Sequence, residues 1–110
     1  MTTTALPVVC IPRLDMAAPD VADAVAAAAL LADPSRATIL SMLADGPVCV
    51  CEMAAALGAR ENNVSNHLAK LRAAGLVRAS RHDANARFLY YERDEAAIAA
   101  ARSALERVLR

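Results

Sequence analysis

The sequence predicts a mainly helical domain that carries one small β-hairpin near its C-terminal end. Alanine is the commonest residue in a chain that is 57% hydrophobic and only 3% aromatic, and alanine has the highest intrinsic helix propensity. Apolar residues recur at helical spacing through most of the chain, and this period changes only around residues 76–92. The length of 110 residues suits one domain. We expect an arm over residues 1–19 and the folded domain over residues 20–110.

The first half of the chain predicts two helices after the arm. Prolines interrupt the arm, which shows no apolar period. Asp20 is expected to cap a first helix that extends to about residue 32. Asp33 is expected to cap a second helix, with Pro34 in its first turn and Gly46 just beyond its end. The apolar residues of this second helix fall at helical spacing, at Ile39, Leu40 and Leu43.

Two further helices are predicted next. A short helix over about residues 51–57 ends at Gly58, and a longer one over about residues 61–74 ends at Gly75. The longer helix has a predicted buried stripe made of Val64, Leu68 and Leu71. Most of its polar side chains should lie off that stripe, and they are Asn62, Asn63, Asn66, His67 and Lys70.

The last third predicts two strands and a helix. Residues 76–82 and 86–92 have strand character and are separated by a three-residue turn. Asp94 is expected to cap the final helix, whose apolar seam of Ile98, Ala101, Leu105 and Val108 suits packing against another helix. Two short helices followed by a hairpin describe a winged helix-turn-helix. In that arrangement the second helix enters the DNA major groove.

The charge distribution supports DNA as a partner although the net charge is +0. Residues 1–59 carry two basic against six acidic side chains, whereas residues 60–93 carry seven basic against three acidic ones. Amide side chains read adenine, and basic or hydroxyl side chains contact bases and phosphates. A solvated helix face, or a winged helix that binds protein instead of DNA, is the alternative. The candidate DNA-binding residues are Arg60, Asn62, Asn63, Ser65, Asn66, His67, Lys70, Arg81 and Arg87.

Several ordered motifs resemble one family. The segments "ALLADPSRATILSMLADG", "CVCEMAAALG", "NNVSNHLAKLRAAGLVRASR" and "RFLYY" are similar to the ArsR/SmtB family of metal-sensing repressors. The resemblance implies a homodimer formed by the first and last helices. It also implies that the "NNVSNHL" helix reads double-stranded operator DNA and that a bound metal releases this DNA. One departure is the wing tip, "HDANAR", where Asn85 stands in place of the family's usual glycine.

The two cysteines of "CVC" are candidate metal ligands. Thiolates are soft ligands that suit Cd(II), Pb(II), Zn(II), Cu(I) or trivalent arsenic. Residues two apart on a helix point about 200° apart. Cys49 and Cys51 can therefore share an ion only if Cys49 lies before the helix or in a distorted first turn. Pro47 favours this arrangement because it delays the start of the helix. The helix N-terminus is expected to lower the pKa of these thiols.

The same motif resembles the "CVCD" signature of cadmium/lead and arsenic sensors, with Glu52 in place of Asp. The resemblance to the cadmium/lead type implies a third thiolate, Cys10, supplied by the arm of the opposite subunit. Cd(II) or Pb(II) is the first expectation, As(III) follows closely, and Zn(II) is an alternative. A fourth ligand would be Asp15, water or nothing. The family's Asp/His/Glu site is excluded because the last helix contains no histidine.

Other classes are less favoured by the sequence. No apolar run reaches the ~18 residues of a membrane span. Three cysteines do not make a disulfide framework, so we expect a cytoplasmic protein with free or metal-bound thiols. An enzyme is not expected, because no nucleophile–base grouping or glycine-rich phosphate loop is found. A thiol redox sensor, in which Cys10 and Cys49 or Cys51 are oxidised, is the rival within DNA-binding regulators.

Overall fold

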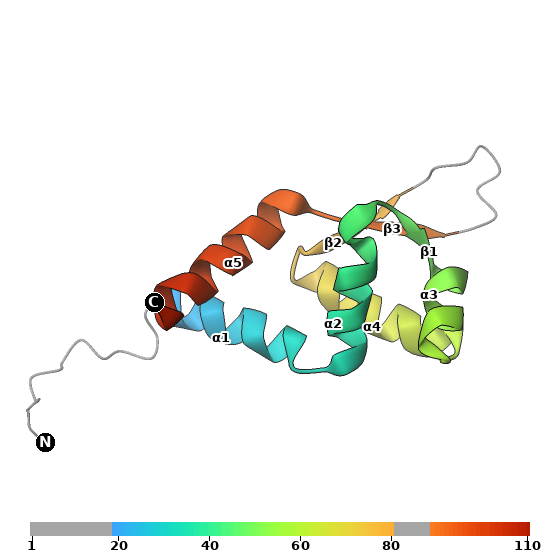
Figure 1. Cartoon of the computed structure of the whole chain (residues 1–110), viewed down its shortest axis with the longest axis horizontal. Helices are drawn as coiled ribbons and strands as arrows, with labels where there is room; N and C mark the ends of the chain where they lie inside the picture. The colour runs from blue at the N-terminus through green and yellow to red at the C-terminus, as the bar shows by residue number, and fades with distance from the viewer. Residues whose placement is uncertain (1–18, 81–88) are drawn as a thin grey trace, which may run out of the picture.

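The computed structural model describes residues 19–80 and 89–110, and Figure 1 shows their arrangement. The predicted fold class is confirmed, since helices dominate and a small antiparallel sheet forms near the C-terminal helix. The elements in chain order are α1 (Pro19–Leu31), α2 (Pro34–Met42), the 3-10 turn η1 (Leu43–Asp45), β1 (Val48–Cys49), α3 (Val50–Leu57), α4 (Glu61–Ala73), β2 (Val77–Ser80), β3 (Tyr90–Arg93) and α5 (Glu95–Leu109).

The sheet has three strands in the order β1-β3-β2, and both pairings are antiparallel. Strands β2 and β3 are the two predicted strands, with described extents of residues 77–80 and 90–93. The first strand, β1, was not predicted. Its two residues pair with β3, Val48 with Tyr91 and Cys49 with Tyr90. A strand of two residues is too short to show alternating apolar and polar residues in the sequence. It can therefore be recognised only from its pairing with β3.

The predicted helix starts are confirmed at α2 and α5. Asp33 Oδ1 accepts hydrogen bonds from the backbone N–H of Ser35 at 2.8 Å and of Arg36 at 3.2 Å. Asp94 Oδ1 accepts from the Ala97 N–H at 3.0 Å. Both carboxylates satisfy N–H groups that have no partner within the helix. Helix α1 begins at Pro19, one residue before the predicted cap, and proline is well tolerated in a first helical turn.

A single arginine fixes the corner between α1 and α2. Arg36 Nε donates to the Leu30 carbonyl at 2.8 Å, and its Nη2 donates to the Ala29 carbonyl at 3.2 Å. These carbonyls belong to the last turn of α1 and have no helical N–H partner. The guanidinium also lies 3.8 Å from the Asp33 carboxylate. The corner therefore sets the angle at which α2 leaves α1 (Figure 1).

The core lies between α2, α3, α4 and the sheet. The predicted stripe of α4 is confirmed, because Val64, Leu68 and Leu71 are fully buried with 0% exposure. They pack in one cluster with side chains of the neighbouring helices, including Ile39, Leu43 and Met53. The three helices and the sheet are consequently joined by one continuous apolar contact surface.

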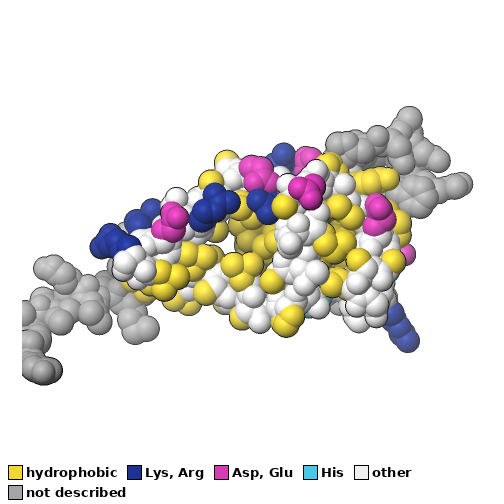
Figure 2. Space-filling model, in the orientation of Figure 1, with side chains coloured by type: hydrophobic (Ala, Val, Ile, Leu, Met, Phe, Trp, Pro, Cys, Tyr) yellow, Lys and Arg dark blue, Asp and Glu magenta, His cyan; other side chains and the backbone are white. Residues whose placement is uncertain are grey.

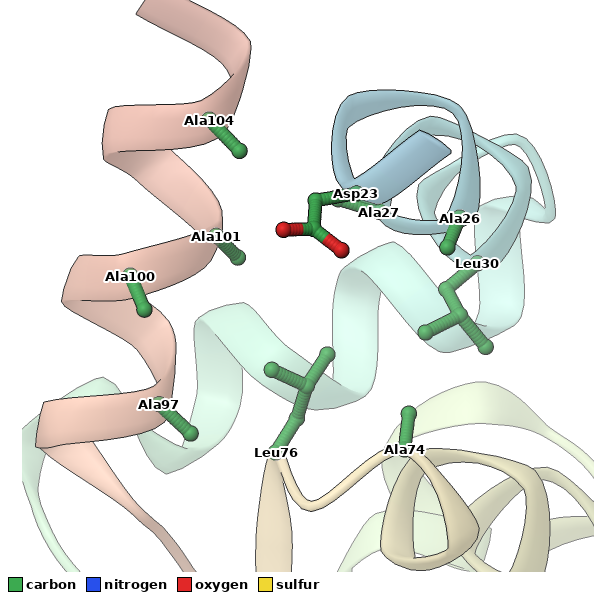
Figure 3. A pocket seen from close by; sticks show the side chains of 10 residues that line it. All are labelled: Asp23, Ala26, Ala27, Leu30, Ala74, Leu76, Ala97, Ala100, Ala101 and Ala104. Atoms are coloured by element: carbon green, nitrogen blue, oxygen red, sulfur yellow. The ribbon is translucent and has the colours of Figure 1, made fainter. Parts of the chain in front are cut away.

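Helices α1 and α5 lie side by side and project from the rest of the domain (Figure 1). Alanines line most of the space between them, so a cavity of about 320 Å³ is left there (Figure 3). The Asp23 carboxylate points into this cavity from α1. Because the facing side chains are small, they do not fill the space between the two helices.

Most of the exposed large apolar side chains lie on the same two helices. Among the described residues, six large hydrophobic side chains are exposed, and five of them lie on α1 or α5. Figure 2 shows hydrophobic side chains gathered along these helices and in the hollow beside α2. The predicted seam of α5 is only partly covered, with Ile98, Ala101 and Leu105 half-buried. The exposed residues are Val21, Val25, Leu31, Val108 and Leu109.

Truncation of Leu68 tests the importance of the core. Leu68→Ala should lower the free energy of unfolding by about 2–5 kcal/mol, because it removes a fully buried side chain and leaves a cavity. Arg72→Ala on the exposed face of the same helix is the control, with an expected change within about 0.5 kcal/mol. Urea unfolding at one fixed protein concentration measures both. Equal losses in the two variants would contradict this account of the core.

Candidate metal centre and nucleic-acid interface

Cys49 occupies the junction between a strand and a helix. It is the last residue of β1 and the N-cap of α3, with extended backbone angles of φ −73 and ψ 144. Cys51 lies in the first turn of α3. The two Sγ atoms lie 2.6 Å apart. The sequence condition for a shared ligand, that Cys49 precede the helix, is therefore met by the backbone.

A capping box fixes the position of Cys49. Its Sγ accepts a hydrogen bond from the Cys51 N–H at 3.4 Å, and the Glu52 carboxylate accepts one from the Cys49 N–H at 3.3 Å. This is the S/T-x-x-E capping pattern with cysteine as the cap. In the sequence, Glu52 stood out only as a departure from "CVCD", although the C-x-x-E spacing already indicates a capping box.

The two thiols differ in exposure and influence one another. Cys49 is buried, with 3% exposure, and Cys51 is half-buried. The hydrogen bond with the Cys49 thiol, followed by burial and the neighbouring charge, raises the pKa of Cys51. The prediction of a lowered pKa is therefore wrong for Cys51, because the adjacent sulfur outweighs the helix N–H groups. A cation that binds both sulfurs would have to displace their protons.

The described residues supply two thiols of the predicted three-thiolate site. Within residues 19–80 and 89–110, no group of three His, Cys, Asp or Glu side chains is close enough to hold a metal ion. Cys10 and the suggested fourth ligand, Asp15, lie outside the described residues. Two converging sulfurs fit a thiophilic ion in donor type. They make a partial site, and the third ligand stays a prediction.

Helix α4 presents its polar residues on the face opposite the core stripe. Six of the candidate DNA-binding residues are exposed on or directly before this helix, namely Arg60, Asn62, Asn63, Ser65, Asn66 and Lys70. His67 differs from them because it is half-buried and its Nδ1 is fully enclosed. Arg81 and Arg87 lie outside the described residues.

Ion pairing separates the basic residues into two groups. Arg78 pairs with Glu92 at 2.9 Å and with Asp94 at 3.5 Å. Arg93 pairs with Glu95 at 2.9 Å and donates to the Leu40 carbonyl at 3.3 Å. These two arginines therefore hold the sheet and α5 in place. In contrast, no ion pair with another described residue involves Arg60, Lys70 or Arg72.

The unpaired cations flank α4. Arg60 precedes the first turn of α4, and Lys70 and Arg72 lie in its last turn. Arg72 was not among the candidate DNA-binding residues. In the sequence, Arg72 contributed only to the charge total. That it forms no ion pair with another described residue is visible only in the folded chain. The exposed amides of α4 are thus bounded by positive charge at both ends, a suitable surface for a phosphate backbone.

This fold and this helix face define a winged helix-turn-helix regulator, with α3 and α4 as the helix pair and β2–β3 as the base of the wing. A model of the family described as "Bacterial regulatory protein, arsR family" matches residues 33–79. The chain belongs to this family. Its relatives in this DNA-binding family are transcriptional regulators, in agreement with the expectation that the chain is not an enzyme.

Three similar proteins illustrate the relationship. The HTH-type transcriptional regulator CmtR of Mycobacterium tuberculosis is 53% identical over 47 residues, which are 43% of this chain and 40% of CmtR. The chain therefore matches less than half the length of this relative. The structure of a possible transcriptional regulator for arsenical resistance has a TM-score of 0.62 at 31% identity, with 76% of this chain and 92% of that chain covered. HlyU from Vibrio cholerae N16961 has a TM-score of 0.66 at 30% identity, with 83% and 96% covered.

The helices have the lengths of an ordinary globular domain. Among the described residues, no helix is both long enough and apolar enough to cross a membrane.

Two substitutions at Cys49 separate its capping role from its thiol. Cys49→Ser keeps a side-chain acceptor at the N-cap, so stability should change by less than about 0.5 kcal/mol. Cys49→Ala removes the acceptor and should lower stability by about 0.5–2 kcal/mol. Urea unfolding of metal-free protein compares the two. If Ala were no worse than Ser, the Sγ hydrogen bond at 3.4 Å would not act as a cap.

Proposed function

We propose that this protein is a metal-responsive transcriptional repressor whose metal-free homodimer binds operator DNA. In this proposal, a thiophilic metal ion bound by Cys49 and Cys51 releases the DNA. The observation that carries the proposal is the convergence of the two sulfurs, 2.6 Å apart, at the start of α3. This position lies inside the helix-turn-helix of an arsR-family regulator.

The polar face of α4 supports operator binding. Its amide side chains suit adenine edges in the major groove, and its flanking cations suit phosphates. In the proposal, Arg60, Asn62, Asn63, Ser65, Asn66, His67 and Lys70 contact DNA, together with Arg81 and Arg87 of the wing. The buried stripe of α4 anchors this face to the domain.

The exposed apolar side chains of α1 and α5 support a homodimer through these helices. Val25 is 60% exposed and Leu109 is 77% exposed, which is unfavourable for a lone chain in water. A dimer through α1 and α5 would bury such side chains. It would also present two copies of α4 to successive major grooves, as dimeric helix-turn-helix proteins do.

The sheet offers a direct route from the thiols to the wing. Cys49 pairs with Tyr90, and the Val50 N–H donates to the Leu89 carbonyl at 3.0 Å. Helix α3, which carries Cys51, also packs against α4 through the buried core. A metal ion bound by both sulfurs would change their 2.6 Å separation and would therefore act on both DNA-contacting elements. A coupling free energy of ~1–3 kcal/mol would be typical of such linkage.

The metal and the third ligand follow from donor type. Cys10, on the arm of the opposite subunit, is the proposed third thiolate. Three thiolates suit Cd(II) and Pb(II), which we place first, and As(III) second, with Zn(II) as a further alternative. When bound, the ion supplies one positive centre that the thiolates share. The chain supplies the thiolates, the capping box that orients Cys49, and the strand that connects it to the wing.

The test is fluorescence anisotropy of labelled operator fragments with reduced, metal-free protein. Cd(II), Pb(II), Zn(II) and arsenite are titrated separately. We expect Cd(II) or Pb(II) to lower operator affinity by about 5–150-fold. Cys49→Ser, Cys51→Ser and Cys10→Ser should each abolish this response and still bind DNA without metal. A normal response in Cys10→Ser would confine the site to the C-x-C pair, and a response to no metal would overturn the proposal.

A second measurement addresses the DNA face. Asn66→Ala should weaken specific operator binding by about 1–3 kcal/mol, because it removes a base contact. Lys70→Gln should weaken binding to all sequences and reduce the salt dependence by about one ion per protomer. Arg78→Gln is the control, since Arg78 is already paired with Glu92 and Asp94 and should alter the salt slope least. Equal effects of all three would contradict the assignment of α4 to DNA.

One observation also favours a second function, a thiol redox sensor. Sulfurs 2.6 Å apart are placed for oxidation to a disulfide. In this reading, hydrogen peroxide would release operator DNA without metal, and a thiol reductant would restore binding. The same anisotropy assay with peroxide distinguishes the two functions, because the metal response requires reduced thiols.

A further inference from the structure

The imidazole of His67 spans the interior and the surface of the domain. Its Nδ1 is enclosed and has no hydrogen-bond partner among the described residues. The residue as a whole is half-buried, and Nε2 is not among the enclosed unpartnered atoms. Leaving a buried polar atom without a partner costs about 1–3 kcal/mol. Such an atom in a DNA-facing helix calls for a functional explanation.

A partly polar cavity lies beside this ring. It has a volume of about 280 Å³, and its lining residues are Ser35, Leu57, Ala59, Asn63, Val64, Asn66 and His67. A cavity of this size and polarity can hold water that bridges buried polar groups. His67 and Ser35, which lies in the first turn of α2, therefore border the same cavity.

A carboxylate, that of Asp33, is hydrogen-bonded to a residue that lines this cavity. The Asp33 carboxylate accepts from the N–H of Ser35, which itself borders the cavity. The pKa of Asp33 is lowered, mainly by its backbone hydrogen bond from Arg36, and the nearby His67 contributes to the shift. Two cations lie on the same two helices, namely Arg36, 3.8 Å from the Asp33 carboxylate, and Lys70, one turn after His67 on α4. Helix α3 contributes only Leu57 to the cavity.

We infer that His67 takes up a proton when α4 docks against operator DNA. The charged imidazole would lie between two anionic groups, Asp33 on the protein side and a DNA phosphate on the other. Its surface nitrogen would donate to the phosphate oxygen, and its Nδ1–H would face the polar cavity. Opposite charges on both sides favour the protonated form of histidine. This inference rests on the proposed function, in that α4 must contact DNA.

The sign of the pH dependence follows from linkage. If the complex binds more protons than its free components, operator affinity increases as the pH falls through the range in which histidine titrates. Full uptake of one proton changes affinity by about tenfold per pH unit. Because histidine titrates within this range, uptake is partial over part of it, and the expected change between pH 8 and pH 6 is an increase of about 3–10-fold for each protomer that takes up a proton.

The experiment uses the full chain and exploits its having only two histidines, His67 and His82. Operator affinity is measured by anisotropy from pH 6 to pH 8 with a chelator present and at constant ionic strength. The native protein and His82→Gln should show the rise at low pH. His67→Gln should give a flat profile. Asp33→Asn keeps an N-cap acceptor but removes the charge, so its profile should be flatter than that of the native protein.

A second readout does not depend on any variant. The NMR signal of the His67 ring proton, followed through a pH titration, should report a higher pKa in the operator complex than in the free protein. An unchanged pKa, or a pH slope that persists in His67→Gln and vanishes in His82→Gln, would overturn the inference. Native protein that binds operator equally at every pH would also overturn it, and the proposed function would then stand. Failure to bind any operator would overturn both.

Discussion

The pairing of β1 with β3 is the constraint on which the candidate site depends. Two residues of strand hold Cys49 in an extended conformation directly before α3. If the helix began earlier and included Cys49, the two cysteine side chains would point about 200° apart. Because the strand delays the helix, both sulfurs lie on one side of the chain. Glu52 then secures this start by accepting a hydrogen bond from the Cys49 N–H. A two-residue strand thus decides whether the motif is a ligand pair.

The same pairing joins the thiols to the rest of the domain. Strand β3 lies between β1 and β2, so in the proposed mechanism a displacement of Cys49 would reach β2 through β3. Met53 of α3 and Val64 and Leu68 of α4 are fully buried in one core. Close-packed interfaces resist small deformations and shift between discrete arrangements. The region around Cys49 is therefore suited to moving two elements together instead of distorting either one.

The sequence predicted what local chemistry determines. The caps Asp33 and Asp94, the helix end at Gly58 and the stripe of α4 depend on residues within a turn or two, and all are confirmed. Strand β1 depends on a partner about 40 residues away, so no local pattern revealed it. The pKa of Cys51 was wrongly predicted because its direction depends on the distance between two sulfurs. The Cys10 ligand lies outside the described residues and stays a prediction.

A chain with a net charge of +0 can still attract two kinds of charged ligand, because its charges are sorted in space. Ion pairs neutralise Arg78 and Arg93 within the sheet and α5, whereas Arg60 and Lys70 at α4 are unpaired among the described residues. Charges act over only about one Debye length, ~10 Å at 0.1 M salt. DNA near α4 therefore responds to the local cations, and a metal cation near the thiols responds to Glu52. Net charge is therefore a poor guide to the partners of this chain.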